Sequence, residues 1–411
     1  MTSNKESGKC DSLNRRQFLV NAGASALAFS LAQPAAVLGA EPAAKINVGL
    51  IGCGGRGQWI AGLFVKHGGY NFVAAADYFQ DRVDGAAKAL GIPAERCFTG
   101  LSGYKRLLEQ KLDAVVIESP PHFHPEQVAA AIAADKHVYL AKPAAVDVPG
   151  CLSIEASGKR AREKKRVFLV DFQTRTHQLY KDCAERIKHG DLGDIISAEA
   201  AYQTGLVREE ADNNRRADPK NLELRLRAWV TDRVLSGDII TEQNIHALDL
   251  ACWMLDAAPL RAYGTGGKRR PYVGDCWDHF SVTFYFPKDV VLTFNSKQAG
   301  FAMDDIMCRV YGMMGTVDAH YAGRVSFKSR EEVFSGEAKG LYATGAEANI
   351  ATFYDNITKG NCDNPTVAPS VRSNLTTILG RSAAYKRSEV TWEEMMRRRE
   401  RFESDLRGLK V

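Results

Sequence analysis

An apolar strand runs directly into a glycine-rich turn in the stretch Ile46-Asn47-Val48-Gly49-Leu50-Ile51-Gly52-Cys53-Gly54-Gly55-Arg56-Gly57. The glycines have the spacing Gly-x-Gly-x-x-Gly, and a second apolar run ends in Asp77, about twenty residues after Gly57. Such glycines let the backbone approach a pyrophosphate, and the start of the following helix supplies N–H donors for it. Strand, turn, helix, strand and acid in this order predict a dinucleotide-binding Rossmann domain.

The turn and the acid define the predicted cofactor site. A carboxylate at this distance binds the adenosine ribose, and its charge repels the 2′-phosphate of NADP. We therefore expect NAD, although Arg82 is close enough in sequence to keep NADP possible. The cofactor-binding residues predicted here are Gly52, Gly54, Gly55, Arg56, Gly57 and Asp77.

A twin arginine precedes this domain. Arg15 and Arg16 stand ahead of a weakly apolar run that ends near Ala40, which is typical of a twin-arginine export signal. Polar residues and Pro34 interrupt the run, which argues against a permanent membrane anchor. We expect residues 1–40 to be a signal peptide and the mature protein to be periplasmic. Because free nicotinamide cofactor is scarce there, the protein should hold its cofactor tightly.

Composition narrows the class of protein. The chain has 411 residues, 45% of them hydrophobic, which is enough for two domains. The net charge is +5, but the arginines near the C-terminus alternate with glutamates as on a solvated helix face, so no nucleic-acid partner is expected. The nine cysteines form no CxxC pair or His/Cys cluster with metal-ligand spacing, so no metal site is predicted. No later apolar run is long enough to predict a stable membrane span.

Two motifs beyond the glycine turn resemble a known family. An apolar strand leads into Ser119-Pro120-Pro121-His122-Phe123-His124-Pro125, and a helix is followed by Asp135-Lys136-His137-Val138 and Ala141-Lys142-Pro143. This is similar to the glucose–fructose oxidoreductase / inositol dehydrogenase (Gfo/Idh/MocA) family, which has a Pro-Pro/Asn-x-x-His loop, Gly-Lys-His-Val and Glu-Lys-Pro. The resemblance covers essentially the whole mature chain. Lys142 is kept, and Ala141 replaces the family's glutamate.

The period of the sequence changes in the second half of the chain. Polar and apolar residues alternate over 279–286, a turn follows at 287–289, and further strands are expected at 290–296 and 307–312. This pattern predicts an antiparallel sheet with one covered face. With the resemblance, the expected fold class is α/β, an N-terminal Rossmann doubly wound parallel sheet plus a C-terminal α+β domain with a large, mainly antiparallel open sheet. We expect the Rossmann domain at 45–171, the substrate and oligomerisation domain at 172–390, and a helical tail at 391–411. The family's use of the open face implies a homo-dimer or homo-tetramer.

Lys142 is the central residue of the predicted active site. The resemblance implies that it lies beside the nicotinamide and contacts the substrate hydroxyl. A lysine near the positive nicotinamide should have a lowered pKa, which suits proton transfer. The loops around it are expected to contact the cofactor through Ser119, Pro120, His122, His124, Lys142 and Gln173. Arg175 is expected to meet substrate hydroxyls.

A predicted helix adds an acid and a histidine. Glu242 and His246 are four residues apart and share a helix face. The family has an acid-x-x-x-His helix facing the cleft, usually with aspartate first. His246 suits acid–base work near neutral pH, with Glu242 tuning or positioning. Asp249 either orients the His246 ring or caps a neighbouring element. The predicted catalytic residues are Lys142, His246 and Glu242; the predicted substrate-binding residues are these three with Arg175 and Asp249.

Three functions fit the sequence. The first is an NAD(P)-dependent oxidoreductase acting on a ring hydroxyl of a sugar, glycoside or cyclitol, with C3 oxidation as one form. The second is a glycoside-cleaving enzyme that uses NAD transiently through oxidation, elimination and reduction. The third is a non-catalytic sugar-binding protein, which retention of Lys142, Glu242 and His246 together argues against. The charged segment 209–227 is expected to be a mobile excursion or interface loop, exposed to solvent.

Overall fold

The structure is a computed structural model that describes residues 45–205, 209–301 and 304–411. The predicted signal peptide lies outside these residues. Within them, we find no helix with both the length and the apolar character needed to cross a bilayer.

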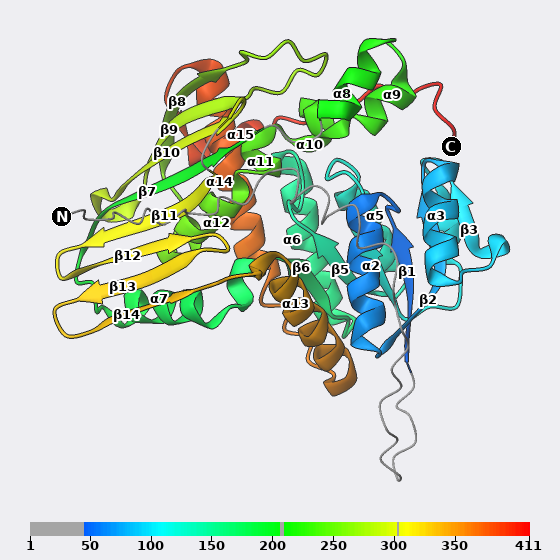
Figure 1. The fold of residues 1–411 in the computed structure, drawn as a ribbon, viewed down its shortest axis with the longest axis horizontal. Helices are drawn as coiled ribbons and strands as arrows, with labels where there is room; N and C mark the ends of the chain where they lie inside the picture. The colour runs from blue at the N-terminus through cyan, green and yellow to red at the C-terminus, as the bar shows by residue number, and fades with distance from the viewer. Residues whose placement is uncertain (1–44, 206–208, 302–303) are drawn as a thin grey trace, which may run out of the picture. The chain divides into compact units, whose positions relative to one another are not determined.

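The first sheet is a six-stranded parallel Rossmann sheet, as predicted (Figure 1). Its order is β3-β2-β1-β4-β5-β6, so the direction of strand addition reverses between β1 and β4. The strands are buried on both faces and accordingly consist almost entirely of apolar residues. Their bounds are β1 (Ile46–Ile51), β2 (Tyr70–Asp77), β3 (Cys97–Thr99), β4 (Ala114–Ile117), β5 (His137–Ala141) and β6 (Phe168–Asp171). The helices among them are α2 (Gly55–His67), α3 (Gln80–Leu90), α4 (Gly103–Leu108), α5 (His124–Ala133) and α6 (Val148–Glu163).

The second sheet has nine strands in the order β14-β13-β12-β11-β7-β10-β9-β8-β15. Every pairing is antiparallel except that of β7 with β10. Along β9, Phe280, Val282 and Phe284 are buried while Ser281 is exposed, so one face is covered and the other is open. This confirms the predicted antiparallel sheet. The strands are β7 (Ile195–Thr204), β8 (Arg261–Gly267), β9 (His279–Tyr285), β10 (Val291–Gln298), β11 (Asp305–Gly312), β12 (Gly315–His320), β13 (Arg324–Ser329), β14 (Val333–Glu337) and β15 (Val390–Thr391).

Helices of the second half pack against both sheets. α7 (Gln178–His189), α12 (Ile245–Met254) and α14 (Val367–Lys386) contribute to the core that covers the nine-stranded sheet. α13 (Leu341–Lys359) instead buries Ala346, Ile350 and Phe353 in the core beneath α2 on the first sheet. The sequence interpretation placed this helix within 172–390. Its packing places it on the Rossmann sheet, because its apolar stripe faces Phe64 and Tyr139 there.

The charged segment 209–227 differs from the expected solvated loop. It forms two short helices, α8 (Glu209–Arg216) and α9 (Leu222–Arg227). Asp212 is fully buried and accepts hydrogen bonds from the backbone N–H groups of Val273 and Gly274 and from Thr231 Oγ1. Leu226 is also buried. The prediction of a solvated loop rested on the charged residues and overlooked the apolar residues spaced among them.

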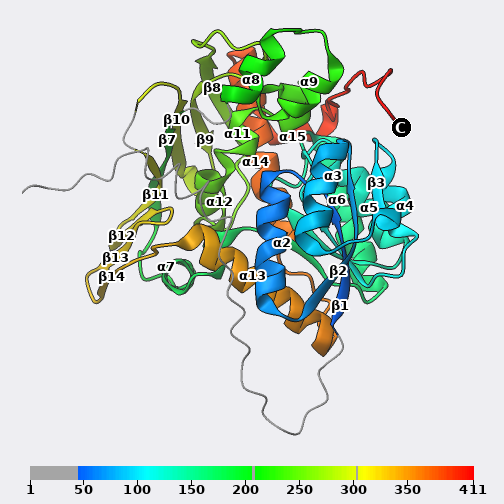
Figure 2. The same cartoon turned by 45° about the vertical axis from the view of Figure 1, so that its right-hand side comes forward.

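The C-terminal tail is only partly helical. α15 (Trp392–Arg398) ends at Arg399, which has a positive φ of 46°, and the chain continues without helix or strand to Val411. In Figures 1 and 2 the C-terminus lies beside the end of β3. The backbone N–H of Leu101 donates a 2.9 Å hydrogen bond to the Lys410 carbonyl, which ties the tail to the Rossmann domain.

Candidate active site

The glycine turn leaves open space beside the start of α2. A Cβ at Gly52, whose φ is +93°, would lie 2.5 Å from the backbone of Glu118 and Ser119, and a Cβ at Gly57 would lie 1.9 Å from the Gly52 oxygen. At Gly54 the nearest atom is 3.6 Å away, and at Gly55 nothing lies within 4 Å. Gly52 and Gly57 are therefore required by packing, while Gly54 and Gly55 leave room for a pyrophosphate. The turn fits a dinucleotide.

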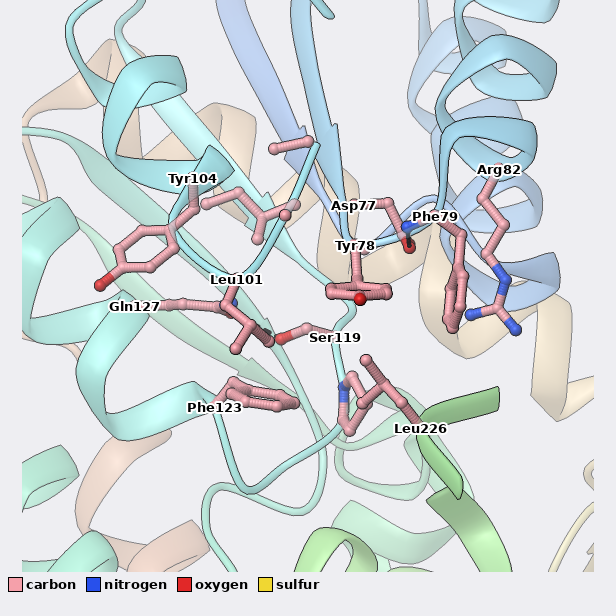
Figure 3. A pocket seen from close by; sticks show the side chains of 15 residues that line it. Asp77, Tyr78, Phe79, Arg82, Leu101, Tyr104, Ser119, Phe123, Gln127 and Leu226 are labelled. Carbon is pink, nitrogen blue, oxygen red and sulfur yellow. Dashed lines mark hydrogen bonds between the residues drawn. The ribbon is translucent and has the colours of Figure 1, made fainter. Parts of the chain in front are cut away.

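The Asp77 carboxylate is fixed at the end of β2. Its Oδ2 accepts a 2.8 Å hydrogen bond from the Cys53 N–H, and its Oδ1 accepts a 3.0 Å bond from the Phe79 N–H. Burial raises the pKa of Asp77, which these backbone donors oppose. The carboxylate borders a pocket with about 520 Å³ of empty space, part of which is open solvent (Figure 3). Side chains drawn around this pocket are Tyr78, Phe79, Arg82, Leu101, Tyr104, Ser119, Phe123, Gln127 and Leu226.

His124 links the two loops that follow β4 and β5. Its Nε2 lies 2.8 Å from the Ser119 carbonyl and its Nδ1 lies 2.9 Å from the Pro143 carbonyl. Burial lowers the pKa of His124 to about 4. The neutral imidazole carries one proton, so one ring nitrogen donates to its carbonyl, and a backbone oxygen lies beside each of the two nitrogens. His122 is anchored differently, since its backbone N–H donates to the Leu235 carbonyl at 3.3 Å.

Lys142 and Glu242 meet although they are 100 residues apart. Lys142 Nζ donates a 2.6 Å hydrogen bond to the Glu242 backbone carbonyl and lies 3.4 Å from Glu242 Oε1. Burial lowers the pKa of Lys142; the carboxylate of Glu242 raises it and the positive charge of Arg56 lowers it further. The ammonium is therefore largely buried at the carboxyl end of β5, with its proton held less firmly than in water.

His246 lies near Lys142, on the helix that follows Glu242. The structure breaks the single predicted helix in two: Glu242 ends α11 (Ile239–Glu242), and His246 is the second residue of α12. His246 Nδ1 is buried and has no hydrogen-bond partner in the part of the chain that the structure describes, and the ring packs 4.9 Å from the Tyr321 ring. Burial is the main cause that lowers the pKa of His246, and the positive charges of Lys142 and Arg56 lower it further. The imidazole is therefore neutral at physiological pH.

A buried ionic cluster lies on the side of the sheet that α2 covers. Arg56 Nη2 donates a 2.7 Å hydrogen bond to Asp171 Oδ2, and its Nε lies 3.2 Å from Glu118 Oε2. Asp171 also accepts from Asn349 at 2.8 Å and from Gln173 at 2.9 Å. Among the described residues, neither Glu118 oxygen has a partner in hydrogen-bond geometry, so this carboxyl is incompletely satisfied. Burial raises its pKa to about 7, against the opposing charge of Arg56.

Sequence reasoning placed Arg56 among the cofactor-binding residues and missed Glu118. Glu118 directly follows β4, and Asp171 ends β6, so both stand at the carboxyl end of the sheet. Ala141 lies between them, because it pairs with Asp171 and its preceding residue pairs with Ile117. A glutamate at 141 would add a third carboxylate to this cluster. Acids at the carboxyl ends of two strands of the same parallel sheet were the available signal.

Arg175 and Asp249 bind each other. Arg175 Nε and Nη2 donate to the two Asp249 oxygens at 3.0 and 2.8 Å. Asp249 therefore does not orient the His246 ring, which was one of the two alternatives raised for it. Arg175 also lies over the ring of Trp253, with its guanidinium carbon 5.2 Å from the ring centroid. Gln173 is buried, with its amide held by Asp171 and 3.4 Å from the Tyr321 hydroxyl.

The fold and the site define an NAD-binding oxidoreductase of the α/β class, and comparison with known proteins gives its family. A family model for an oxidoreductase family with an NAD-binding Rossmann fold matches residues 46–172. A second model, for the GFO/IDH/MocA C-terminal domain, matches residues 180–318. The chain belongs to the GFO/IDH/MocA family. The predicted family, NAD cofactor and oxidoreductase class are thereby confirmed.

The individual proteins compared share less than a third of their aligned residues with this chain. Inositol 2-dehydrogenase 3 of Saccharopolyspora erythraea is 28% identical over 330 residues, covering 78% of this chain and 87% of the relative. Glycosyl hydrolase family 109 protein 3 of Phocaeicola vulgatus is 30% identical over 164 residues, covering 38% of this chain and 29% of the relative. The structure of scyllo-inositol dehydrogenase from Lactobacillus casei with NAD(H) and scyllo-inositol aligns with a TM-score of 0.67 at 18% identity, covering 85% of this chain and 99% of that chain.

Proposed function

We propose that this protein oxidises a ring hydroxyl of a sugar, glycoside or cyclitol with a tightly bound NAD. The observation that carries the proposal is the largely buried Lys142 ammonium, held by Glu242 near a His246 nitrogen that has no partner among the described residues. All three lie at the carboxyl side of the first sheet, where Rossmann domains bind their ligands near the reversal of strand order. Bound NAD supplies one function that the side chains lack, since it accepts a hydride.

Lys142 has the features of a proton acceptor for the substrate hydroxyl. Its lowered pKa makes the neutral amine accessible closer to neutral pH than for a surface lysine. The neutral amine takes the hydroxyl proton, which leaves oxygen-centred negative charge that favours loss of hydride from the same carbon. Glu242 holds Nζ through its carbonyl and presents its carboxylate alongside. In our proposal, substrate oxygen replaces part of this contact.

His246 can serve a neighbouring hydroxyl. The neutral imidazole has one donor and one acceptor nitrogen, and its buried Nδ1 has no partner within the described residues. A ring carrying adjacent hydroxyls offers an oxygen for it. A substrate that lacked this second hydroxyl would leave the nitrogen unsatisfied, which costs binding free energy.

The substrate class is proposed from relatives. Inositol 2-dehydrogenases are among the relatives, and a structural neighbour is described with scyllo-inositol. The decisive experiment incubates purified protein with NAD and a panel of cyclitols, pyranoses and glycosides, and follows NADH absorbance and keto products. A keto cyclitol or a 3-keto glycoside without bond cleavage supports the proposal. No product and no reduction of cofactor across the panel would refute it and favour the sugar-binding alternative.

A second candidate is redox-neutral glycoside cleavage. The partial match to a glycosyl hydrolase family 109 protein favours it, and a neutral His246 is a suitable base for removing a C–H proton next to a ketone. Retention of Lys142 favours the dehydrogenase. Incubation with a glycoside in deuterated water separates the two candidates, because elimination would release free sugar that carries deuterium at C2.

We also propose a cellular location and an oligomeric state for this protein. The twin-arginine segment supports export to the periplasm, where a bound cofactor must be reoxidised or re-reduced within the catalytic cycle by a second sugar, an external acceptor or the returning ketone. The open face of the nine-stranded sheet is the surface we propose for a homo-dimer or homo-tetramer. Cell fractionation tests the location, and light scattering of the purified protein tests the assembly.

A further inference from the structure

One wall of the adenosine pocket comes from the second half of the chain. The pocket at the end of β2 is lined mainly by Rossmann residues such as Asp77, Phe79 and Phe123. Of the described residues that line it, Leu226 alone lies outside residues 45–171. Figure 3 shows Leu226 reaching from its own ribbon segment toward the space beside Tyr78 and Phe123.

The chemistry of this pocket suits an adenosine group. Leu101 and Phe123 from the Rossmann domain and Leu226 from α9 supply apolar surfaces, which suit a planar base. The Asp77 carboxylate at the pocket edge suits ribose hydroxyls. Without Leu226, this pocket would lack its only described wall from outside the Rossmann domain.

Leu226 belongs to a small apolar cluster separate from the two main cores. Its buried members are Phe79, Leu226, Leu235 and Leu409. Three stretches of chain therefore meet here: the residues just after β2, the segment around α9, and the C-terminal tail. Since Phe79 also lines the pocket, the cluster connects the pocket wall directly to both distant segments.

Polar contacts tie α9 to the same wall. Arg227 donates two hydrogen bonds to the Asp81 carboxylate at 2.6 and 3.1 Å, and its guanidinium carbon lies 3.8 Å from the Phe79 ring centroid. The Tyr78 hydroxyl donates a 2.8 Å bond to Glu223. These contacts are at the surface, so each is individually weak and reversible.

The C-terminal tail supports the wall from the other side. The Lys410 backbone N–H donates to the Tyr78 hydroxyl at 3.2 Å, and its carbonyl accepts from the Leu101 N–H at 2.9 Å. Lys410 Nζ also contacts Thr99. Tyr78 and Leu101 both line the pocket, so the tail buttresses two of its walls.

We propose that α9 and the tail residues 406–411 form an adenosine cap, which completes the adenosine half of the NAD site and slows release of the cofactor. The cap must separate from Phe79 and Tyr78 before adenosine can leave past Leu226. Its many weak contacts allow opening, while the buried cluster makes opening infrequent. This supplies a structural basis for cofactor retention that does not depend on the substrate.

The test compares two leucines, one in the proposed cap and one outside it. Leu226→Ala removes the wall, whereas Leu260→Ala truncates an exposed leucine that belongs neither to the cluster nor to the pocket lining. The probes are ADP-ribose, for affinity by calorimetry, and NADH, for its dissociation rate by fluorescence. For Leu226→Ala we expect ADP-ribose binding to weaken, and NADH release to accelerate, by about tenfold or more. For Leu260→Ala we expect both to stay within about twofold of wild type.

Equal effects of the two substitutions, or wild-type values for Leu226→Ala, would overturn the proposal. If Leu226→Ala does not fold, amide hydrogen exchange of the wild-type chain decides. ADP-ribose should slow exchange at Leu226 and Arg227, and unchanged exchange there would overturn the cap. Because no substrate is used, this outcome is independent of which hydroxyl compound the enzyme oxidises.

Discussion

Lys142 Nζ donates its 2.6 Å hydrogen bond to the backbone carbonyl of Glu242, while the Glu242 carboxylate lies farther away, at 3.4 Å. The other carboxylate oxygen, Oε2, accepts a hydrogen bond from the Gln243 side-chain amide. Lys142 is therefore positioned by backbone, and Glu242 acts on it mainly through charge. This arrangement separates the position of the amine from its pKa, and the two can be tested independently.

Replacing Lys142 with alanine should lower kcat by about a hundredfold or more, the usual cost of losing a positioned acid–base group. The measurement is steady-state oxidation of the best substrate from the panel. Thermal unfolding should show that the variant is folded. Lys105→Ala is the matched control, since Lys105 is an exposed lysine of the same domain. Near-normal turnover in Lys142→Ala would remove the residue from proton transfer.

Glu242→Gln should shift the pH profile of kcat. In the wild type, turnover should rise with pH as Lys142 loses its proton. The Glu242 carboxylate raises the pKa of Lys142 against the larger effect of burial, so neutralising it lowers that pKa further. The rising limb should therefore move to lower pH, by about one unit. A limb that stays in place or moves to higher pH would show that Lys142 is not the titrating group.

The Rossmann domain was predictable because its signals are local. The glycines, Asp77 and the apolar strands lie within one short stretch, and each has a direct physical role in the turn. The antiparallel sheet was predictable for the same reason, since its period of two is visible along β9. Lys142, Glu242 and His246 were predicted from motifs. The structure brings Lys142 and Glu242 into contact although they are 100 residues apart.

Features that depend on tertiary packing were missed. The break between α11 and α12 lies at Gln243 and Asn244, where nothing in the spacing of apolar residues marks an interruption. The charge of segment 209–227 hid Leu226, whose burial requires Phe79 from another domain. Arg56 was predicted to bind the cofactor, so its ion pair with Glu118 was not predicted. Each of these depends on a neighbour distant in sequence.

Asp77→Ser should change the preference between cofactors. Loss of the carboxylate removes repulsion of a 2′-phosphate, and Arg82 lines the same pocket. We expect the ratio of NADP to NAD affinity to rise by about tenfold. Affinity for both should fall, because the Cys53 and Phe79 N–H groups lose their acceptors. Calorimetric titration with both dinucleotides measures the ratio, and the exposed Asp84→Ser is the control. An unchanged ratio would exclude Asp77 from the ribose site.

His246→Ala should lower kcat by about a hundredfold while leaving ADP-ribose binding unchanged, because His246 lies by Lys142 and not in the adenosine pocket. His246→Gln keeps a donor and an acceptor but has no basic nitrogen. If His246 only binds a hydroxyl, glutamine should restore much of the activity; if it transfers a proton, glutamine should be as inactive as alanine. Wild-type turnover in the alanine variant would contradict both roles.

Glu118→Gln should alter how stability depends on pH. Burial raises the pKa of Glu118 to about 7, above its value in the unfolded chain. The native state therefore holds a proton that the unfolded state has lost, and the wild type loses stability as pH rises between these two pKa values. Glutamine cannot ionise and lacks this loss. The difference in Tm, variant minus wild type, should thus become more positive between pH 5 and pH 8, by a few degrees. Glu126→Gln, at an exposed carboxylate, is the control. A difference in Tm that is independent of pH, or that becomes more negative, would show that Arg56 keeps Glu118 ionised throughout this range.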